Sequence, residues 1–412
     1  MRKTYKITTL GCKVNQQESE AIAADFDALG FTQARKGEAA DICVINSCTV
    51  TSIADSKTRQ RIRQARKANP DALVCVAGCL PEVDREKVSA MPEVDIVIGS
   101  LDKERAAEII ASSSREFLIG LSPLCDKPRG IPVLDARTRA LIKVEDGCDR
   151  FCAYCIVPYA RGPVRSRGIE EVVSEAKGLL DAGYKELVLT GVNLAMHDDL
   201  YTLVESVCSV EKDAEYRVRL GSLEPNVISA GEAVRIAKIK GVCPQFHLSL
   251  QSGSKKTLKE MGRPYAPEDY SEIVKGLRGI DPLFSITTDV IVGFPGEGDD
   301  DFEESLDFVR NTGFARVHVF KYSKRQWTRA AEMAGQVPET VKNERSRKMI
   351  DAAEAGAERF LEQNQGKSRN TLIFGPDKNG RSMRGLTDNG IDVSLPYGTG
   401  NYKTNTLVDI KL

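Results

Sequence analysis

Long apolar runs are missing from this 412-residue sequence, and none approaches the roughly 18 residues that a membrane-spanning helix needs. The N-terminus enters a strand-like segment without the apolar core of a signal peptide, so we expect a cytoplasmic protein with no membrane partner. An excess of charge of one sign is also missing, because the net charge is −1. The surface as a whole therefore does not act as an electrostatic nucleic-acid binder, and any such role must come from local basic patches.

Histidine is scarce, with three residues, whereas cysteine is plentiful, with eleven. Without a signal segment, this many thiols indicate a reducing compartment and ligand chemistry. Cys148, Cys152 and Cys155 are too closely spaced, and odd in number, to satisfy one another as disulfides. Soft thiolates select zinc, copper(I) or iron–sulfur centres. Zinc would need a fourth cysteine or histidine, and none follows within about thirty residues, so a 4Fe-4S cluster with one open iron fits best.

Residues 4–112 alternate between strand-like and helical runs, which predicts a parallel sheet covered by helices on both faces. The expected strands are 5–10, 41–46, 72–76 and 95–98, and the expected helices are 15–29 and 52–68. In such sheets the working residues lie just past the strand C-termini. Cys12, Cys48 and Cys79 all stand at such positions. Singly, each is best interpreted as a small buried hydrophobe, but together they predict a shared metal site.

A second strand–helix alternation follows a serine-, proline- and arginine-rich linker at 116–138. Its six units are too few for a complete eight-unit barrel. They predict a partial (βα)6 barrel of the TIM type, with the loop of Cys148 following its first strand at the catalytic face. The expected strands are 140–144, 186–190, 216–220, 246–250, 285–292 and 315–320.

Beyond a long charged helix at 340–365, short strands and turns predict a small β-barrel. The fold class is therefore α/β with a β tail. We expect an N-terminal α/β domain over residues 1–115, the partial barrel over 139–365 and the β-barrel over 366–412.

Cys148, Cys152 and Cys155, with the aromatic Tyr154 before the last cysteine, resemble the radical S-adenosylmethionine superfamily. The resemblance implies a 4Fe-4S cluster on these cysteines, S-adenosylmethionine as its ligand, and Tyr154 beside the adenine. Strand ends on the catalytic face of a barrel point at such a ligand. We therefore expect further cofactor contacts from Gly191, Asn193, Glu224, Ser249 and Gln251. For Gly191, a turn that requires glycine is the alternative.

Four further stretches resemble the methylthiotransferases: residues 11–16 (GCKVNQ), 155–162 (CIVPYARG), 250–254 (LQSGS) and 293–297 (GFPGE). The resemblance covers essentially the whole chain and implies a TRAM-like, RNA-binding tail. It also implies that Cys12, Cys48 and Cys79 hold a second 4Fe-4S cluster, whose sulfur is methylated by one S-adenosylmethionine. A radical from a second S-adenosylmethionine then activates the substrate carbon. The resemblance also implies an electron donor such as flavodoxin or ferredoxin. We expect a monomer. No histidine is assigned as a metal ligand, because the two cysteine triads account for the metals.

The substrate branch is indicated by residues 13–16 and 189–194, which resemble the enzymes that act on N6-threonylcarbamoyladenosine in tRNA. The resemblance implies insertion of a methylthio group at C2 of this nucleoside at position 37, in the anticodon loop. The product is 2-methylthio-N6-threonylcarbamoyladenosine. Isopentenyladenosine in tRNA and an aspartate of a ribosomal protein are the alternative substrates. A tRNA-binding iron–sulfur sensor without chemistry is the non-enzyme alternative.

Two local basic patches predict contacts to the RNA backbone, although a solvated charged face is the usual role of such runs. The predicted contacts are Arg59, Arg63, Arg66, Lys324, Arg325 and Arg329. Tyr159 and Tyr322 are expected to offer stacking surfaces to an unstacked base. Trp327 stands where the family resemblance leads us to expect glycine, and it either stacks on RNA or packs locally.

Overall fold

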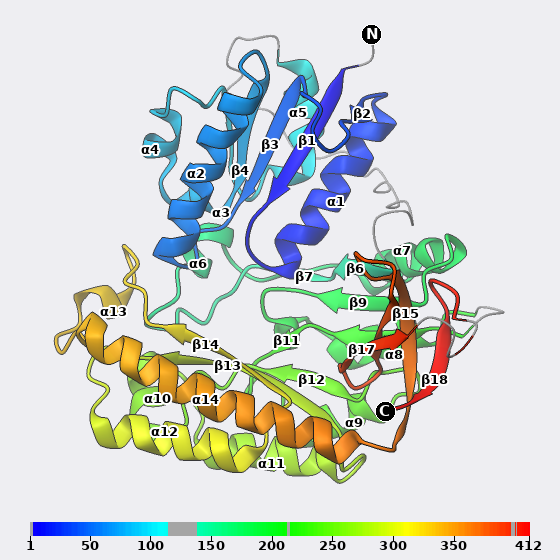
Figure 1. The fold of residues 1–412 in the computed structure, drawn as a ribbon. Coiled ribbons are helices and arrows are strands. Elements are labelled where there is room, and N and C mark those ends of the chain that lie inside the picture. The colour runs from blue at the N-terminus through cyan, green and yellow to red at the C-terminus, as the bar shows by residue number, and fades with distance from the viewer. Residues whose placement is uncertain (1–2, 114–137, 212–214, 397–399, 401) are drawn as a thin grey trace.

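The N-terminal part of the computed structural model is a parallel five-stranded sheet in the order β2-β1-β3-β4-β5 (Figure 1). Residues 3–113, 138–211, 215–396, 400 and 402–412 are described, so nearly all of the predicted linker at 116–138 lies outside the description. The strands are β1 (Thr4–Thr9), β2 (Thr32–Gln33), β3 (Ile42–Ser47), β4 (Leu73–Gly78) and β5 (Ile96–Ile98). The two-residue β2 was not predicted.

Two apolar layers pack on this sheet, and together they bury β3 along its whole length. One layer contains Ile22 and Phe26 of the first helix, and the other contains Ile62 of the second. The helices are α1 (Lys13–Ala28), α2 (Ser52–Ala68), α3 (Cys79–Val83), α4 (Arg85–Ser89), η1 (Lys103–Arg105) and α5 (Ala106–Ser112). The prediction of a parallel sheet covered on both faces is therefore confirmed.

The middle of the chain forms a partial barrel from two sheets with the orders β10-β9-β6 and β11-β12-β13-β14, all paired in parallel. The strands are β6 (Arg139–Lys143), β9 (Glu186–Thr190), β10 (Arg217–Leu220), β11 (Ser222–Leu223), β12 (Gln245–Leu248), β13 (Ser285–Val292) and β14 (Arg316–Lys321). Only Gly221 separates β10 from β11, so these two strands together count as one strand position. With that count, all six predicted strand positions are present. A small antiparallel pair, β7 (Glu145–Asp146) and β8 (Arg165–Ser166), flanks the cysteine loop.

Helices cover the outer face of the barrel, where they bury the largest apolar core of the molecule (Figure 1). Strand residues alternate in direction, so Leu187 and Leu189 face these helices and Glu186 faces the interior. The helices are α6 (Val157–Arg161), α7 (Ile169–Asp181), η2 (Leu194–Met196), α8 (Leu200–Cys208), α9 (Ala230–Ala237), α10 (Lys255–Met261), α11 (Pro267–Arg278), α12 (Asp299–Thr312), α13 (Arg329–Glu332) and α14 (Glu339–Asn364). Among the described residues, no helix has the length and hydropathy to cross a membrane.

The C-terminal part is a four-stranded antiparallel sheet in the order β17-β16-β15-β18, as expected of a small β domain. Its strands are β15 (Ser368–Pro376), β16 (Ser382–Thr387), β17 (Asp392–Pro396) and β18 (Leu407–Lys411). Arg217 and Arg219, near the start of β10, attach this sheet to the barrel. Their guanidinium groups donate to backbone carbonyl oxygens of Asn370, Leu386, Thr387 and Asp388 at 2.7 to 3.0 Å.

Glu186 holds both arginines in place, with ion pairs of 2.6 Å to Arg217 and 2.9 Å to Arg219. All three side chains are almost completely buried. Burial by itself would raise the pKa of Glu186, but Arg219 and Arg217 outweigh it and hold the pKa at about 2. The charged carboxylate therefore joins the floor of the barrel to the C-terminal sheet.

Replacing Glu186 by Gln keeps the shape of the side chain but leaves two buried guanidinium groups without their anion. Breaking a buried pair in this way costs about 3–5 kcal/mol. We expect Glu186→Gln to melt at a lower temperature than the wild type, and to be cleaved faster by protease between α14 and β15.

The stabilising charge is present above the ordinary carboxyl pKa and is lost as the pH falls toward the folded-state value of about 2. The difference in melting temperature between Glu186→Gln and the wild type should therefore shrink as the pH falls below about 4.5. Circular dichroism melts measure it, with the exposed Glu303→Gln as the control. Identical melting of Glu186→Gln and the wild type at pH 7 would contradict this role.

Candidate active site between two cysteine groups

The barrel cysteine group, Cys148, Cys152 and Cys155, lies in the loop after β7. Gly147 opens this loop with a φ of +87°, and a Cβ there would lie 1.9 Å from the carbonyl oxygen of Pro163. Only glycine allows so close an approach. The loop therefore folds tightly onto the segment after α6.

Burial, together with a smaller contribution from the nearby thiol of Cys152, raises the pKa of Cys148 to about 11 and that of Cys155 to about 12. The three thiols therefore lie near one another. Buried thiols ionise when positive charge, such as that of a metal, is placed beside them. This donor set fits a thiolate-bound iron–sulfur cluster.

The N-terminal cysteine group, Cys12, Cys48 and Cys79, lies at the C-terminal ends of the adjacent strands β1, β3 and β4. Gly11 has a φ of +104°, and a Cβ there would lie 3.0 Å from Sγ of Cys48. Burial raises the pKa of Cys48 to about 11, and the thiols of Cys79 and Cys12 add to the rise. The structure thus brings these three residues together, and their donor set also fits a cluster.

The two cysteine groups adjoin each other. Cys79 packs with Ile156 and Ala160 in one small apolar cluster, and Ile156 directly follows Cys155. The beginning of α3 therefore rests on α6, and the loop that carries the barrel cysteine group leads straight into this contact. The space between the N-terminal sheet and the barrel is the candidate active site.

Arg161, at the end of α6, connects the elements that carry the two groups. Its buried guanidinium group donates to Asn15 Oδ1 at 2.5 Å, to Glu18 Oε1 at 3.0 Å and to Asp146 Oδ1 at 2.8 Å. Asn15 and Glu18 belong to α1, which Cys12 caps, and Asp146 lies two residues before Cys148. A single side chain thus sets how α1 meets the barrel cysteine loop.

Glu224, just past β11, is the centre of a polar network beside the barrel cysteine group. Its Oε1 lies 3.1 Å from Nε of Arg150 and 2.7 Å from a guanidinium nitrogen of Arg263, and its Oε2 accepts from Asn193 Nδ2 at 2.7 Å. Arg263 also donates to the hydroxyl group of Tyr154 at 3.0 Å. Three of the residues predicted to contact the cofactor therefore share one network.

Gly191 leaves room for a neighbouring carboxylate, because a Cβ there would lie 2.5 Å from Oε2 of Glu145. This oxygen accepts from the backbone N–H of Asn193 at 2.8 Å, and burial raises the pKa of Glu145 to about 8. The close carboxylate of Glu145 explains why a small residue stands at position 191, although the backbone there has no left-handed turn that would require glycine. The cofactor contact of Gly191 stays a prediction.

The remaining two predicted cofactor contacts follow β12, at the same end of the barrel. The backbone carbonyl oxygen of Ser249 accepts from the hydroxyl group of Tyr265 at 2.9 Å. Gln251 is buried with a φ of +67°, and its N–H donates to the carbonyl oxygen of Asp289 at 2.8 Å. Neither arrangement tests a cofactor contact, so both predictions stand as made.

Several residues of the site were not predicted, notably Arg150, Arg263 and Arg161. Arg161 belongs to the stretch 155–162 that carries the family resemblance, and Arg150 lies between two of the cysteines, so both had a sequence signal. Arg263 reaches the site from just past α10, more than a hundred residues from Tyr154, and no spacing in the sequence marks it.

The six predicted RNA contacts divide into two classes. Arg59 is partly exposed, and Arg63, Lys324 and Arg329 are exposed, so their charges reach solvent. The other two are bonded within the protein. Arg66 pairs with Asp95 at 2.5 Å and donates to three backbone carbonyl oxygens, while the buried Arg325 pairs with Asp55 at 2.8 Å. Both guanidinium groups therefore have internal partners, and their contacts to RNA stay predictions.

Three exposed aromatic rings line the rim of the candidate site. Phe151 and Tyr159 meet edge to face with centroids 5.7 Å apart, and Tyr159 lies 6.3 Å from Trp327. Tyr322, in contrast, is buried against Phe294, so its predicted stacking role is wrong. Trp327 has a φ of +68°, the left-handed conformation that glycine adopts freely. The backbone of this loop thus turns as glycine would, which explains the family expectation at this position.

Two family models match the chain. "Uncharacterized protein family UPF0004" matches residues 4–99, and "Radical SAM superfamily" matches residues 142–309. The radical S-adenosylmethionine methyltransferase TsrM from Kitasatospora setae, solved with cobalamin and a [4Fe-4S] cluster bound, has a similar fold, with a TM-score of 0.59. The similarity covers 80% of this chain and 77% of that one at 13% sequence identity, so it concerns the fold alone.

Relatives with assigned names narrow the class of radical S-adenosylmethionine enzyme. The threonylcarbamoyladenosine tRNA methylthiotransferase MtaB of Bacillus subtilis is 38% identical over 87% of this chain and 82% of its own length. The protein of the same name from Thermotoga maritima is 39% identical over 90% and 86%. The tRNA-2-methylthio-N(6)-dimethylallyladenosine synthase of Caldicellulosiruptor saccharolyticus is 35% identical over 93% and 85%.

The chain therefore belongs to the methylthiotransferase family of radical S-adenosylmethionine enzymes. The resemblance stated from the sequence motifs is confirmed, and with it the expectation of a transferase. Membership of the superfamily implies S-adenosylmethionine and one 4Fe-4S cluster as cofactors.

Replacing Arg161 by Gln should loosen the contact between α1 and the barrel, because Glu18 and Asp146 would remain charged and buried. A loss of about 3–5 kcal/mol is expected for a broken buried pair. Hydrogen exchange followed by mass spectrometry should show faster exchange in α1, together with a lower melting temperature. Arg165→Gln is the matched control, because Arg165 is 42% exposed and lies 3.5 Å from the same Asp146. Equal exchange in both variants would contradict the assignment.

Proposed function

We propose that this enzyme is a tRNA methylthiotransferase that replaces the C2 hydrogen of N6-threonylcarbamoyladenosine at position 37 with a methylthio group. The product is 2-methylthio-N6-threonylcarbamoyladenosine. The observation that carries the proposal is the contact of the two cysteine groups through Cys79, Ile156 and Ala160. An unactivated C–H bond needs a radical, and the sulfur to be inserted must be held close to the radical source but apart from it. The names of the relatives in Bacillus subtilis and Thermotoga maritima support the choice of nucleoside.

The six cysteines would hold two 4Fe-4S clusters, one on Cys148, Cys152 and Cys155 and one on Cys12, Cys48 and Cys79. When bound, the first would supply the electron that cleaves S-adenosylmethionine and the second the sulfur that is inserted. We infer two S-adenosylmethionine molecules per turnover and a reductant such as flavodoxin or ferredoxin. We also infer a cytoplasmic monomer.

The protein's own residues would bind and orient the cofactor. Glu224 is fixed by Arg150, Arg263 and Asn193, so its carboxylate is positioned to accept from amine or hydroxyl groups of a ligand. Tyr154 would lie along the adenine. Gly191, Ser249 and Gln251 complete the set proposed for the cofactor.

The three parts of the chain would divide the work. Residues 1–115 would carry the sulfur, 139–365 would generate the radical, and 366–412 would form a TRAM-like module that binds RNA. Arg59, Arg63, Lys324 and Arg329 would contact phosphates of the anticodon stem-loop, since their charges reach solvent. The exposed rings of Phe151, Tyr159 and Trp327 would stack on unpaired bases.

Nucleoside analysis tests the reaction directly. Reconstituted enzyme with S-adenosylmethionine, reductant and tRNA should raise the mass of N6-threonylcarbamoyladenosine by CH2S in a digest analysed by mass spectrometry. Parallel reactions with isopentenyladenosine tRNA and with ribosomal protein separate the alternatives. An unchanged threonylcarbamoyladenosine beside a modified isopentenyladenosine would assign the other tRNA branch. Absence of deoxyadenosine would favour the sensor.

Changing Cys12 to Ala should separate the two cluster roles. Deoxyadenosine formation should continue, because the barrel cysteine group is intact, while insertion of sulfur should stop. Iron content should fall from about eight to about four atoms per chain. Cys208→Ala is the control, since Cys208 lies outside both groups. About eight iron atoms in Cys12→Ala would contradict the ligand assignment.

A further inference from the structure

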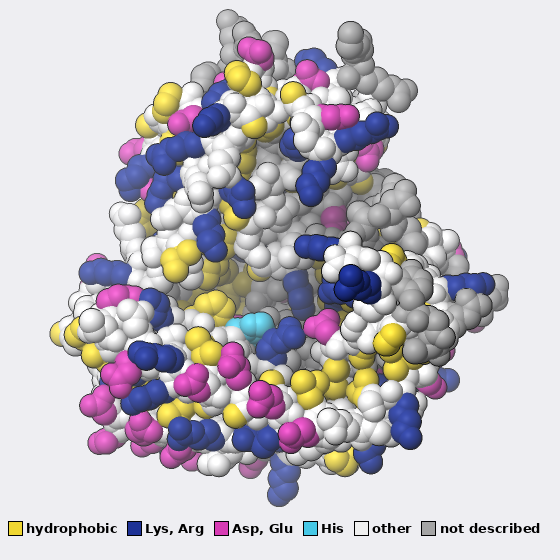
Figure 2. Space-filling model, viewed as in Figure 1, with side chains coloured by type: hydrophobic (Ala, Val, Ile, Leu, Met, Phe, Trp, Pro, Cys, Tyr) yellow, Lys and Arg dark blue, Asp and Glu magenta, His cyan; other side chains and the backbone are white. Residues whose placement is uncertain are grey.

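A polar hollow faces the N-terminal sheet from inside the partial barrel. Figure 2 shows histidine, lysine and arginine side chains gathered in a depression between these two parts. Strand alternation explains the polarity, because Ile286 and Val290 enter the core on the helix side of β13, which turns Thr287 and Asp289 to the interior.

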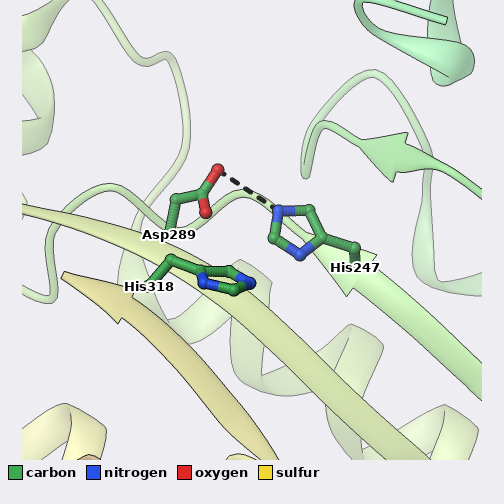
Figure 3. A group of neighbouring side chains, drawn as sticks. All are labelled: His247, Asp289 and His318. Atoms are coloured by element: carbon green, nitrogen blue, oxygen red, sulfur yellow. Dashed lines mark hydrogen bonds and ion pairs between the residues drawn. The ribbon is translucent and has the colours of Figure 1, made fainter. Parts of the chain in front are cut away.

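His247, Asp289 and His318 form the floor of the hollow (Figure 3), with one ligand-type atom of each within 4.8 Å of the others. Nε2 of His247 lies 3.2 Å from Oδ2 of Asp289, and its Nδ1 lies 3.0 Å from the hydroxyl group of Thr287. Both nitrogens of His247 are therefore engaged. His318 is exposed, and among the described residues it has no hydrogen-bond partner.

Lys13 approaches the hollow from the start of α1, next to Cys12. It is exposed to solvent, and its positive charge acts on His318 at the floor of the hollow. No described residue forms an ion pair or a side-chain hydrogen bond with Lys13. An exposed cation without a paired carboxylate is suited to receive an anion from outside.

Positive charges also act on His318 at the floor of the hollow. Burial lowers the pKa of His318, and His247, Arg316 and Lys13 lower it further against the opposing charge of Asp289. Arg217 and Arg219 are already committed to Glu186 and to backbone carbonyl oxygens, so they do not compete for a ligand. Two imidazoles and a carboxylate also suit a divalent cation. Here, however, Lys13 would repel such an ion, and His247 already uses both ring nitrogens, so the surroundings favour an anion.

We propose that Lys13 and His318 form a subsite for a carboxylate, namely the carboxylate of the threonyl group of the substrate nucleoside. The assignment rests on the proposed function, because that function brings a carboxylate into the barrel. Lys13 adjoins Cys12, so an anion held there keeps its nucleoside between the two cysteine groups. An isopentenyl group has no anion to offer, so the subsite selects for the threonylcarbamoyl group.

Binding of two anticodon stem-loop RNAs tests the subsite. One carries N6-threonylcarbamoyladenosine at position 37, and the other carries the same nucleoside with its carboxylate converted to a carboxamide. The wild type should bind the carboxylate RNA about tenfold more tightly, as a charge-assisted hydrogen bond predicts. Lys13→Gln should lose this preference, His318→Gln should reduce it, and Lys13→Arg should keep most of it. Fluorescence anisotropy measures the affinity of the wild type and of each variant for both RNAs, with the exposed Lys275→Gln on α11 as the control.

The alternatives give different results. Equal weakening of both RNAs by Lys13→Gln would show a phosphate contact and overturn the subsite. Stoichiometric zinc that disappears in His318→Gln would show a metal site and overturn it too. Iron content is measured in each variant, because Lys13 adjoins Cys12. If Lys13→Gln loses iron, the carboxylate preferences of Lys13→Arg and His318→Gln test the subsite instead. A wild type that never forms the methylthio product would refute the proposed function alone, whereas product formation without any carboxylate preference would refute the subsite alone.

Discussion

The buried ion-pair network around Arg161 is the interaction on which the two-group site depends. Glu18, on α1, faces the cations of Arg161, Lys103 and Lys143, and all four side chains are almost fully buried. Burial by itself would raise the pKa of Glu18, but these cations hold it at about 2, so the carboxylate remains charged. The desolvation of such groups offsets much of their attraction, which limits the net stability that they add. Any displacement of α1 would nevertheless leave a buried charge uncompensated. The network therefore fixes the orientation of the N-terminal sheet on the barrel more than it stabilises the fold.

What the sequence predicts follows from whether a residue acts locally. Strand β9 and helix α2 were predicted at their observed bounds because hydrophobic periodicity is a local property. Cys12, Cys48 and Cys79 were predicted to converge because strands of one parallel sheet end at the same edge. The internal ion pairs of Arg66 and Arg325 were not predicted because they depend on partners distant in the chain, such as Asp55, 270 residues before Arg325. Arg263 was not predicted for the same reason, because its partners Tyr154 and Glu224 are distant in the chain. Local sequence patterns therefore predict the helices, the strands and the candidate cysteine ligands. The charged residues that orient these elements can be identified only from the tertiary structure.

Some of the strained backbone positions lie near the two cysteine groups. Phe151, Gln251 and Trp327 are non-glycine residues with φ between +44° and +68°. Such conformations cost on the order of 1–3 kcal/mol each and persist only where surrounding contacts enforce them. At Phe151 and Trp327 the strain turns an aromatic ring outward, next to Tyr159. Strained backbone conformations thus keep aromatic rings exposed to solvent. An exposed apolar patch of this kind is typical of a surface that binds a ligand, and aromatic rings suit a ligand with aromatic groups.

Net neutrality and an anionic polymer as substrate are compatible because the positive charge of this chain is unevenly placed. The C-terminal sheet closes the barrel floor by accepting from Arg217 and Arg219, and Glu186 neutralises them there. Closure at the floor leaves the side facing the N-terminal sheet as the approach to the interior, and this is where Lys13 remains exposed. A potential confined to one opening would attract a single unstacked nucleotide of the proposed substrate without binding a whole RNA surface. Specificity then depends on the few groups inside the opening, and long-range attraction, which salt would screen, contributes little.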